Sequence, residues 1–378
     1  MDIKEYKAGV LVKQATGYKS FIPTEINHSF TWSEAAVNTQ MEKASLQLGA
    51  LNSFSQFVPD IDLFIRMHVV KEATVSSRIE GTQTNMEEVL VKQSDVTPEK
   101  RNDWQEVNNY VNAMNYAIER LAQLPLSSRL LKETHNILLD NARGKHKLPG
   151  EFRSSQNWIG GASITDAVFV PPPFHEVNRL MGDLETFIHN DDISVPHLIK
   201  IAIAHYQFET IHPFLDGNGR IGRLMITLYL ISNKIIDKPI LYISDFFEKH
   251  KGLYYDNLML VRRTNDLTQW IKFFLEAVDQ TSRNASQSLQ QIMLLRQDCE
   301  GRRIISLGRK APNAKKLLDH LFTQPILNAQ QIAEILRISQ VSAYKLIVDF
   351  TNAGILKELT GFKRNRYFIF QEYLDIFH

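Results

Sequence analysis

Apolar residues recur every three to four positions along most of the chain, which predicts a mainly α-helical protein. Up to residue 209, helices are predicted at residues 32–52, 61–80, 102–124, 127–140, 175–190 and 196–209. One stripe of the second helix carries Leu63, Met67, Val70 and Thr74. Gly81 follows that helix, as a helix-ending glycine does. The polar, turn-rich residues before the first helix predict an extended arm.

A short segment between the predicted helices interrupts this pattern. Two glycines at 160–161 precede it, and three prolines at 171–173 follow it. Between these turn residues lie the β-prone Ala167, Val168, Phe169 and Val170. Turn residues around a short apolar run favour a strand over a helix, so we expect a small β-hairpin flap here.

The last part of the chain has a pattern of its own, after breaks near residues 300–303 and 310–312. Helices are predicted at 314–323, 328–336 and 340–353, and residues 356–370 predict two strands joined at Gly361. Three helices followed by a hairpin is the order of a winged helix-turn-helix. The sequence therefore predicts three parts: an arm with helices at 1–100, a helical core at 101–300 and a winged-helix domain at 311–378.

Composition adds limits to this picture. The 43 basic and 42 acidic residues nearly cancel, so no overall charge marks a nucleic-acid binder, although a local patch would still serve. Cys299 is the only cysteine, which excludes an intramolecular disulfide and a thiolate metal cluster within the chain. The first residues lack an apolar leader, and no apolar run is long enough to span a bilayer. We therefore expect a cytoplasmic protein without a membrane partner.

The most informative stretch is residues 212–223, which lie between two apolar helical patterns and read His-Pro-Phe-Leu-Asp-Gly-Asn-Gly-Arg-Ile-Gly-Arg. Gly217 and Gly219 flank Asn218, and this arrangement lets successive backbone N–H groups point into one concavity that suits phosphate oxygens. A helix begins at the same place, so its positive dipole end adds to the site. The stretch predicts a phosphate-binding loop.

Charged side chains of this loop suit nucleotide chemistry. Arg220 and Arg223 lie three residues apart on the first helical turn, so both guanidinium groups can reach one phosphate. Asp216 is placed to hold Mg²⁺ that bridges phosphate groups. His212 is the candidate base, because an unperturbed imidazole titrates near neutrality. The alternative is a Gly-Asn-Gly turn with a capping acid and two solvated arginines, but one loop that gathers all these groups favours the nucleotide site.

The loop resembles the signature of the Fic family, His-x-Phe-x-Asp/Glu-Gly-Asn-Gly-Arg-x-x-Arg, at every specified position. The resemblance extends over roughly residues 60–300 and includes the flap that precedes the loop. It implies an all-α core that binds Mg-ATP and transfers AMP to Ser, Thr or Tyr of a target protein. In this family His212 would deprotonate the target hydroxyl and Asp216 would hold the metal. The phosphates would be held by Gly217, Asn218, Gly219, Arg220 and Arg223.

The resemblance and the helical pattern together predict roles for further residues. The flap at Ala167–Val170 would dock the target segment by strand addition. Arg153 would brace the site, and Asn257 would contact the nucleotide. Tyr254 and Tyr255 would line the adenine pocket or pack as core aromatics. Three histidines are expected to be core residues, namely His68, His135 and His205.

The end of the helix predicted at 61–80 carries a candidate autoinhibitory motif, formed by Ser76 and Glu80, which we call the brake. Ser76 and Glu80 lie four residues apart, so they share one helix face. Alone, this pair is an ordinary helix C-terminus. Beside the phosphate loop, however, residues 76–81 (Ser-Ser-Arg-Ile-Glu-Gly) resemble the Fic inhibitory motif, Ser/Thr-x-x-x-Glu-Gly/Asn. The resemblance implies an inhibitory helix at about 61–81, in which Glu80 pairs with Arg223 and displaces the γ-phosphate from its productive place.

Two function classes follow from the sequence. The first is an autoinhibited protein adenylyltransferase with a protein substrate, self-modification and a homodimer as further expectations. The second is a DNA-binding regulator whose Fic core senses nucleotide, with DNA contacts at Lys345, Lys363, Arg364 and Arg366. A winged helix that docks proteins would leave these residues without a DNA role. Within the enzyme class, another donor than ATP or removal of AMP is the alternative.

Overall fold

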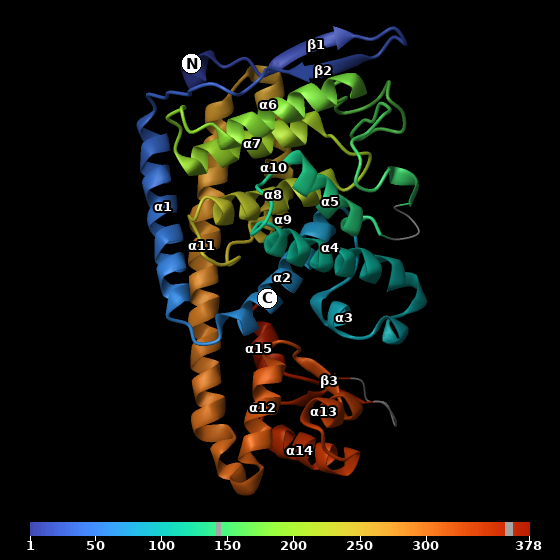
Figure 1. Ribbon diagram of the computed structural model, residues 1–378, viewed down its shortest axis with the longest axis vertical. Coiled ribbons are helices and arrows are strands. Elements are labelled where there is room, and N and C mark those ends of the chain that lie inside the picture. The colour runs from blue at the N-terminus through green and yellow to red at the C-terminus, as the bar shows by residue number, and fades with distance from the viewer. Residues whose placement is uncertain (141–144, 360–365) are drawn as a thin grey trace.

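The computed structural model describes residues 1–140, 145–359 and 366–378, and its helices form an elongated molecule (Figure 1). The helices of the larger part are α1 (Ala35–Gln56), α2 (Ile61–Ile79), α3 (Met86–Leu90), α4 (Arg101–Arg120), α5 (Ser128–Leu138), α6 (Val177–His189), α7 (His197–Ile211), α8 (Asn218–Ser232), α9 (Ser244–Lys249), α10 (Lys251–Thr264) and α11 (Leu267–Asp298). The mainly α-helical prediction is confirmed, and the predicted helix bounds differ from these by a few residues.

Helices α7 and α8 form the centre of the molecule. Every residue of α7 from Leu198 to Ile211 is buried, and α8 is buried from Asn218 to Tyr229 except at Gly219. A helix that is apolar on all sides is stable only when other elements surround it. Helices α2, α4 and α5 contact α8, while α6 and α11 contact α7. The loop between these two central helices, which carries the predicted site, is therefore held on a rigid scaffold.

The N-terminal residues form a β-hairpin instead of the expected extended arm. Strand β1 (Gly9–Lys13) pairs antiparallel with β2 (Lys19–Pro23), and Gly17 takes a positive φ of 95° in the turn. The hairpin lies at the end of the molecule that is opposite the C-terminal helices (Figure 1). Its β2 strand reaches the flap, because the Phe21 N–H donates to the Val170 carbonyl at 2.9 Å.

The predicted flap is less regular than a hairpin of two strands. A single antiparallel bridge joins Ile159 to Phe169, and the Val168 N–H donates to the Ile159 carbonyl at 2.9 Å. Gly161 takes a positive φ of 76°, and a Cβ at this position would collide with the backbone of Asp166. The flap is thus a tight loop whose two sides pair only at Ile159 and Phe169.

Helix α11 connects the two ends of the molecule. It packs along α1, and residues Cys299–Arg303 continue it as a π-helical turn where the sequence predicted a break. The chain turns back only at Gly308, whose φ is 54°. Figure 1 shows α11 running from the central helices down to the C-terminal elements.

The C-terminal elements form a compact group of helices around a small sheet. They are α12 (Ala311–Leu321), β3 (Ile326–Asn328), α13 (Ala329–Leu336), α14 (Gln340–Asn352), β4 (Lys357–Glu358), β5 (Tyr367–Ile369) and α15 (Gln371–Asp375). The strand order is β3-β5-β4, so the unpredicted β3 pairs with the second predicted strand. Gly361 lies outside the described residues. The winged-helix assignment and the three-part domain division stay predictions.

Candidate active site

The loop between α7 and α8 is shaped by two left-handed residues. His212 ends α7 with φ 49° and ψ 61°, and Gly217 precedes α8 with φ 75° and ψ 5°. Arg153 fixes the beginning of the loop, because its Nε donates to the His212 carbonyl at 3.0 Å and its Nη2 donates to the Pro172 carbonyl at 2.6 Å. The buried Arg153 thus ties the loop to the flap, as its predicted bracing role requires.

Asn218 locks the loop from the inside. Its Oδ1 accepts from the Phe214 N–H at 2.8 Å, and its Nδ2 donates to the Phe214 carbonyl at 2.8 Å. The ring of Phe214 is buried and stacks on His135 with 3.8 Å between centroids. The Asn218 side chain therefore has a structural role, and only its backbone N–H is left for the predicted phosphate contact.

His135 also orients the loop, which agrees with its predicted place in the core. Its Nδ1 accepts from the Gly150 N–H at 3.0 Å, so its Nε2 carries the proton that it donates to the Asp216 carbonyl at 3.0 Å. Burial lowers the pKa of His135 to about 4, which keeps this ring neutral at pH 7. His205 is likewise buried, with Nδ1 on the Gly222 carbonyl and Nε2 on the Tyr254 hydroxyl.

His212 has the electrostatics of a neutral base. Burial, and to a smaller extent the positive charge of Arg262, lower the pKa of its imidazole to about 4. At pH 7 the ring is therefore unprotonated and able to accept a proton. Its Nδ1 is buried and has no hydrogen-bond partner among the described residues.

Arg220 offers unpaired donors at the start of α8. Its side chain is buried, yet Nε and Nη1 find no hydrogen-bond partner among the described residues. The nearest carboxylates, those of Glu106 and Asp216, stay 3.9 Å and 3.7 Å from its guanidinium nitrogens. The first backbone N–H groups of a helix also lack intrahelical partners. Buried unpaired donors at a helix N-terminus suit an anion, as expected for phosphate.

Asp216 fits a metal that the substrate brings with it. Its Oδ1 accepts from the Gly217 N–H at 2.6 Å, and its side chain is about half exposed. Among the described residues, no group of three or more His, Cys, Asp or Glu side chains could hold a metal by itself. Mg²⁺ in nucleotide sites typically uses one or two carboxylates together with phosphate oxygens and water. A lone exposed aspartate beside an anion site matches that pattern.

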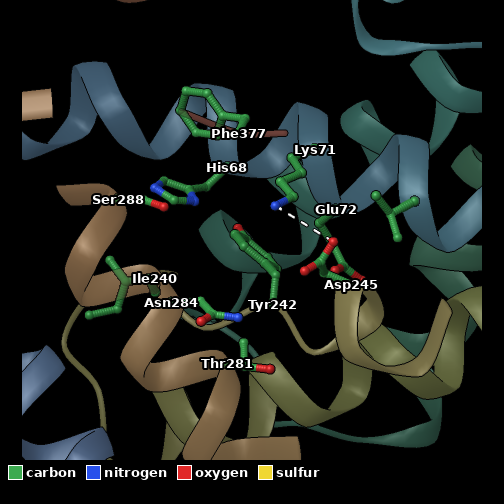
Figure 2. A pocket seen from close by; sticks show the side chains of 12 residues that line it. His68, Lys71, Glu72, Ile240, Tyr242, Asp245, Thr281, Asn284, Ser288 and Phe377 are labelled. Carbon is green, nitrogen blue, oxygen red and sulfur yellow. Dashed lines mark ion pairs between the residues drawn. The ribbon is translucent and has the colours of Figure 1, made fainter. Parts of the chain in front are cut away.

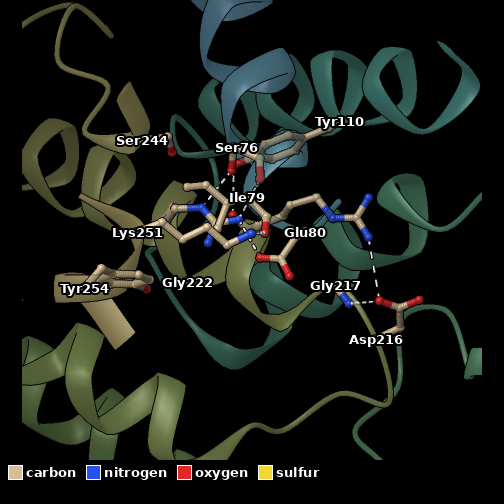
Figure 3. A network of polar contacts seen from close by, with 12 residues as sticks. Ser76, Ile79, Glu80, Tyr110, Asp216, Gly217, Gly222, Ser244, Lys251 and Tyr254 are labelled. Atoms are coloured by element: carbon tan, nitrogen blue, oxygen red, sulfur yellow. Dashed lines mark hydrogen bonds and ion pairs between the residues drawn. The ribbon is translucent and has the colours of Figure 1, made fainter. Parts of the chain in front are cut away.

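Arg223 is held by the two residues that the sequence assigned to the brake. Its Nε donates to the Ser76 hydroxyl at 2.8 Å, while its Nη2 donates to the Ser76 carbonyl at 2.9 Å and to Glu80 Oε1 at 2.7 Å. Figure 3 shows Ser76 and Glu80 close together at the end of α2. The predicted pairing of Glu80 with Arg223 is thus present in the structure.

In this ion pair, each residue favours the charged form of the other. Burial alone would raise the pKa of Glu80, but the charge of Arg223 and the hydrogen bond that it donates lower this pKa below the ordinary value. The Arg223 side chain is 1% exposed, and although burial opposes its charge, Glu80 helps to raise its pKa. A buried charge that loses its partner is costly, so Arg223 requires an anion whenever Glu80 leaves.

Two neighbours position the carboxylate of Glu80. Gly219 lies directly beneath it, and a Cβ at residue 219 would collide with Glu80 Oε1. Lys251 donates from Nζ to the Ile79 carbonyl at 2.6 Å, which satisfies the C-terminal end of α2 (Figure 3). No sequence pattern indicated the Lys251 contact, because it joins residues 172 positions apart.

A cavity of about 470 Å³ opens beside these groups and joins the loop to the flap. Its polar lining includes Glu80, Glu209, His212, Arg223, Tyr254, Tyr255 and Arg262, and its apolar lining includes Trp158, Ile159, Val168, Phe169, Leu258 and Met259. Tyr254 and Tyr255, which were expected to line an adenine pocket or to pack as core aromatics, both line this cavity. Asn257 is absent from this lining, and its Nδ2 donates within its own helix to the Leu253 carbonyl at 2.8 Å.

The flap contributes one wall of this cavity. Phe169 is buried under the guanidinium of Arg262, with 3.8 Å from the Arg262 Cζ to the ring centroid. Val168 lines the cavity and is 59% exposed, while Ala167 and Val170 are half-buried. The flap thus reaches the cavity through its middle residues.

Sequence reasoning missed Glu209 and Arg262, which lie at the back of the cavity. Glu209 is 7% exposed, and its Oε1 has no hydrogen-bond partner among the described residues. Burial raises the pKa of this carboxyl to about 7, against the lowering effect of Arg223. A signal was available, since Glu209 is the only acidic residue in the apolar run of α7.

Of the four residues expected to contact DNA, the structure describes two, Lys345 and Arg366. Lys345 is exposed on α14, and Arg366 lies 3.3 Å from Glu358. Lys363 and Arg364 lie outside the described residues. Among the helices that the structure describes, none combines the length and the apolar character needed to cross a membrane.

Comparison with known sequences identifies two matching family models. Residues 38–119 match the model of the Fic/DOC family N-terminal region, and residues 125–230 match the model of the Fic/DOC family. A protein adenylyltransferase Fic from Aedes aegypti is 32% identical over 133 residues, which cover 35% of this chain and 24% of the relative. A protein of the same name from Drosophila grimshawi is 28% identical over 174 residues, which cover 45% of this chain and 32% of the relative. The chain thus matches about a quarter to a third of the length of these curated relatives.

Solved structures show the same fold. A Fic family protein from Desulfovibrio desulfuricans G20 superimposes with a TM-score of 0.58 at 21% identity, over 91% of this chain and 98% of that chain. A Fic domain containing signalling protein from Bacteroides thetaiotaomicron VPI-5482 gives a TM-score of 0.53 at 18% identity, over 66% of this chain and 97% of that chain. Because the first of these alignments covers most of both chains, the likeness extends beyond the helices around the loop.

Proposed function

This chain is a Fic family protein, and from that premise we propose that it is an autoinhibited protein adenylyltransferase. It transfers AMP from Mg-ATP to a Ser, Thr or Tyr hydroxyl of a target protein. The names of the curated relatives support this reaction, and the loop from His212 to Arg223 supports it in this chain. The observation that carries the proposal is the buried Arg223, whose guanidinium is held by Glu80 and Ser76 at the site of an incoming phosphate.

The proposed reaction is a nucleophilic displacement at the α-phosphorus. The target hydroxyl oxygen forms a bond to this phosphorus, the bond from the phosphorus to the bridging β-phosphate oxygen breaks, and pyrophosphate leaves. His212 takes the hydroxyl proton. Its lowered pKa supports this role, because the imidazole is free to accept a proton at neutral pH.

Other residues of the loop bind and orient the triphosphate. Arg220 and the backbone N–H groups of Gly217, Asn218 and Gly219 hold phosphate oxygens, and Arg223 binds the γ-phosphate once Glu80 has left. Asp216 would hold Mg²⁺, which neutralises phosphate charge and favours departure of pyrophosphate when bound. Productive transfer needs in-line geometry, so a misplaced phosphate slows the reaction strongly.

Glu80 inhibits by occupying the arginine that the γ-phosphate needs. One guanidinium nitrogen cannot serve the Glu80 carboxylate at 2.7 Å and a phosphate in the same place. The target segment reaches the site along the flap, where Val168 is exposed beside the cavity. Backbone recognition of this kind fixes the position of a hydroxyl more than its sequence context, which also permits self-modification.

The first test compares wild type, Glu80→Gly and His212→Ala after incubation with Mg²⁺ and α-labelled ATP, with and without host lysate. We expect Glu80→Gly to incorporate AMP at least about 10-fold faster than wild type, because the γ-phosphate regains Arg223 and with it the in-line geometry. The double variant Glu80→Gly/His212→Ala should incorporate none. Intact mass and autoradiography measure the adduct.

Arg78→Gly is the matched control, because it also places a glycine near the end of α2 but at a largely exposed side chain. It should behave as wild type, which separates loss of the carboxylate from weakening of the helix. Equal labelling by wild type and Glu80→Gly would contradict the brake. The absence of any adduct with ATP, followed by labelling with another nucleotide, would reassign the donor.

The DNA-binding regulator has less support from the structure. The exposed face of α14 carries Val341, Tyr344 and Val348, with Lys345 as its basic member. A helix that reads DNA presents basic and amide side chains to phosphates and bases. DNA contact therefore stays a prediction, and a homodimer likewise.

A further inference from the structure

The helix that carries Glu80 also contacts the C-terminal elements. Near its N-terminus, the ring of Phe64 meets Phe322 edge-on with 5.5 Å between centroids, and the ring of His68 meets Phe377 with 5.1 Å between centroids. Arg296 of α11 joins the same region, because its Nη2 lies 2.9 Å from Asp60 just before α2 and 3.1 Å from Asp319 of α12. The start of α2 is thus held by the residues from 311 to 378, which we call the C-terminal unit.

The chain that follows Glu80 meets the same unit. The Tyr367 hydroxyl of β5 donates to Asp95 at 2.5 Å, and Tyr367 itself is buried. At the end of the chain, His378 Nε2 lies 3.3 Å from Glu87 of α3. The C-terminal unit therefore contacts the polypeptide on both sides of Glu80.

Behind α2, the packing of the core is incomplete. A small cavity of about 50 Å³ separates α2 from α9 and α11, and Figure 2 shows His68, Tyr242 and Asn284 around it, with Phe377 beside His68. His68 Nε2 and the Tyr242 hydroxyl are buried without a hydrogen-bond partner among the described residues. Voids and unpaired buried polar groups reduce the packing and hydrogen-bond energy that fixes a helix against the core. Phe377 covers this weakly packed place.

A displacement at this end of α2 is transmitted to the brake. Glu72, Ser76 and Glu80 are spaced four residues apart, so they lie on one face of the helix. A helix rises 1.5 Å per residue, which places His68 roughly 18 Å from Glu80 along one stiff rod. If this rod tilted as a unit, Glu80 would be displaced relative to Arg223.

We propose that the C-terminal unit sets the strength of the brake by holding α2 and the segment after Glu80 against the core. The inference rests on the proposed function, since it names the regulation of the same site. A binding partner that pulled the C-terminal unit from α2 would then activate transfer without touching the nucleotide site.

The test uses full-length variants in the wild-type and the Glu80→Gly background. Phe377→Ala removes the ring that covers the cavity, and Tyr367→Phe removes only the hydroxyl, which donates to Asp95. Tyr344→Phe is the matched control, because Tyr344 lies on the exposed face of α14. Each variant is assayed for AMP incorporation, and hydrogen exchange of the α2 amides is measured by mass spectrometry.

We expect Phe377→Ala to raise AMP incorporation about three- to tenfold, since buried aromatic pairs contribute energies of that order to an equilibrium. Tyr367→Phe should raise it less, and Tyr344→Phe should leave it unchanged. In the Glu80→Gly background none of the three should add activity, because the brake is already absent. The α2 amides should exchange faster in Phe377→Ala and in Tyr367→Phe than in wild type.

Suppose that Glu80→Gly incorporates AMP fast, while Phe377→Ala and Tyr367→Phe show the AMP incorporation and the hydrogen exchange of wild type. That result would overturn this inference and leave the proposed function standing. If Glu80→Gly labels nothing, the proposed function is wrong, and hydrogen exchange still decides whether the C-terminal unit holds α2. Should Phe377→Ala not fold, Tyr367→Phe carries the test.

Discussion

Glu80 and Glu209 both lie near Arg223, and their carboxyl groups differ in protonation at neutral pH. Glu80 makes the hydrogen bond at 2.7 Å, and Arg223 lowers the pKa of its carboxyl. Glu209, by contrast, is buried without a hydrogen-bond partner for Oε1 among the described residues, and burial raises its pKa to about 7. At neutral pH only the first carboxylate is fully charged. Of these two carboxyl groups, Glu80 is therefore the charged partner of Arg223, and under the proposed function the triphosphate would replace it.

Glu209 gives a prediction for stability. Its pKa is about 7 in the folded protein and near 4.5 in the unfolded chain, so its contribution to stability is present below pH 4.5 and is lost as the pH rises to 7. We expect Glu209→Gln, which does not titrate, to gain about 2–3 kcal/mol relative to wild type between pH 5 and pH 8. Urea unfolding at both pH values measures the difference. Glu119→Gln on the exposed face of α4 should show no such pH dependence.

The site residues differ in how far the sequence predicted them. Residues 212–223 form a contiguous motif, so the sequence alone places their side chains in one loop. Glu80, which pairs with Arg223 of this loop, was predicted from a second short motif at residues 76–81. Lys251 and Arg262 contribute through contacts between segments far apart in the chain, which one sequence does not reveal. The sequence predicted that Asn218 helps to hold phosphate, but it did not reveal that the Asn218 side chain bonds the Phe214 backbone, which satisfies polar groups of the loop itself.

Among the elements, α7 and α8 cross closely at the site. Gly222 of α8 faces Phe208 and Glu209 of α7, and a Cβ there would meet the Glu209 carboxylate and the Phe208 ring. His205 also reaches across to the Gly222 carbonyl at 3.0 Å. The small residue allows the two helices to place His212 and Arg223 in one cavity.

Gly222→Ala should therefore be destabilising, by about 1–3 kcal/mol as for overpacked cores. Gly182→Ala in α6 is the matched control, since a Cβ at residue 182 meets no atom within 4 Å. In that open helical position alanine should be neutral or stabilising by up to about 1 kcal/mol. Urea denaturation of both variants gives the two values. Equal stability of the two would show that α7 and α8 can separate without cost.

The elements themselves were predictable where their periodicity was long. Helices such as α2 and α14 repeat an apolar stripe over several turns, and their predicted bounds lie within a residue of those observed. The hairpin of β1 and β2 was missed because each strand has only five residues, and β3 has three. So short a strand has too few alternating positions to be recognised, and its pairing partner decides its structure.

At the scale of the whole molecule, buried histidines dominate the response to acid. Four of them have pKa values lowered by burial to about 3 or 4, namely His68, His135, His205 and His212. A histidine with a lowered folded pKa contributes stability above pH 6.5 that is lost as the pH falls toward its folded value. Two buried glutamates, Glu72 and Glu209, act in the opposite direction because burial raises their pKa to about 7.

We therefore expect the free energy of unfolding to fall on acidification by roughly 2 kcal/mol per pH unit between pH 6 and pH 5, because the histidines outnumber the glutamates. Near pH 7 the two effects offset each other, so stability should level there. Thermal melts from pH 5 to pH 8 check this profile. A melting temperature that stays constant from pH 7 to pH 5 would contradict the neutral state of these histidines.

The overall arrangement also shows where sequence reasoning ends. The separate pattern after residue 310 was visible, and the contact of that segment with α2 was not. Phe377 and Tyr367 reach α2 and Asp95 across nearly the whole length of the chain. Such contacts are fixed by tertiary packing, for which a helical stripe specifies a buried face but not its partner.

Under the proposed function, the shared guanidinium of Arg223 would make the activity depend on the concentration of nucleotide. If the closed pair with Glu80 is favoured tenfold over the open state, the apparent dissociation constant for a productively bound triphosphate rises by about the same factor. The output then grows with triphosphate concentration over a range where an unbraked enzyme is already saturated. In a starved cell the same contact would keep the enzyme silent without any additional signal.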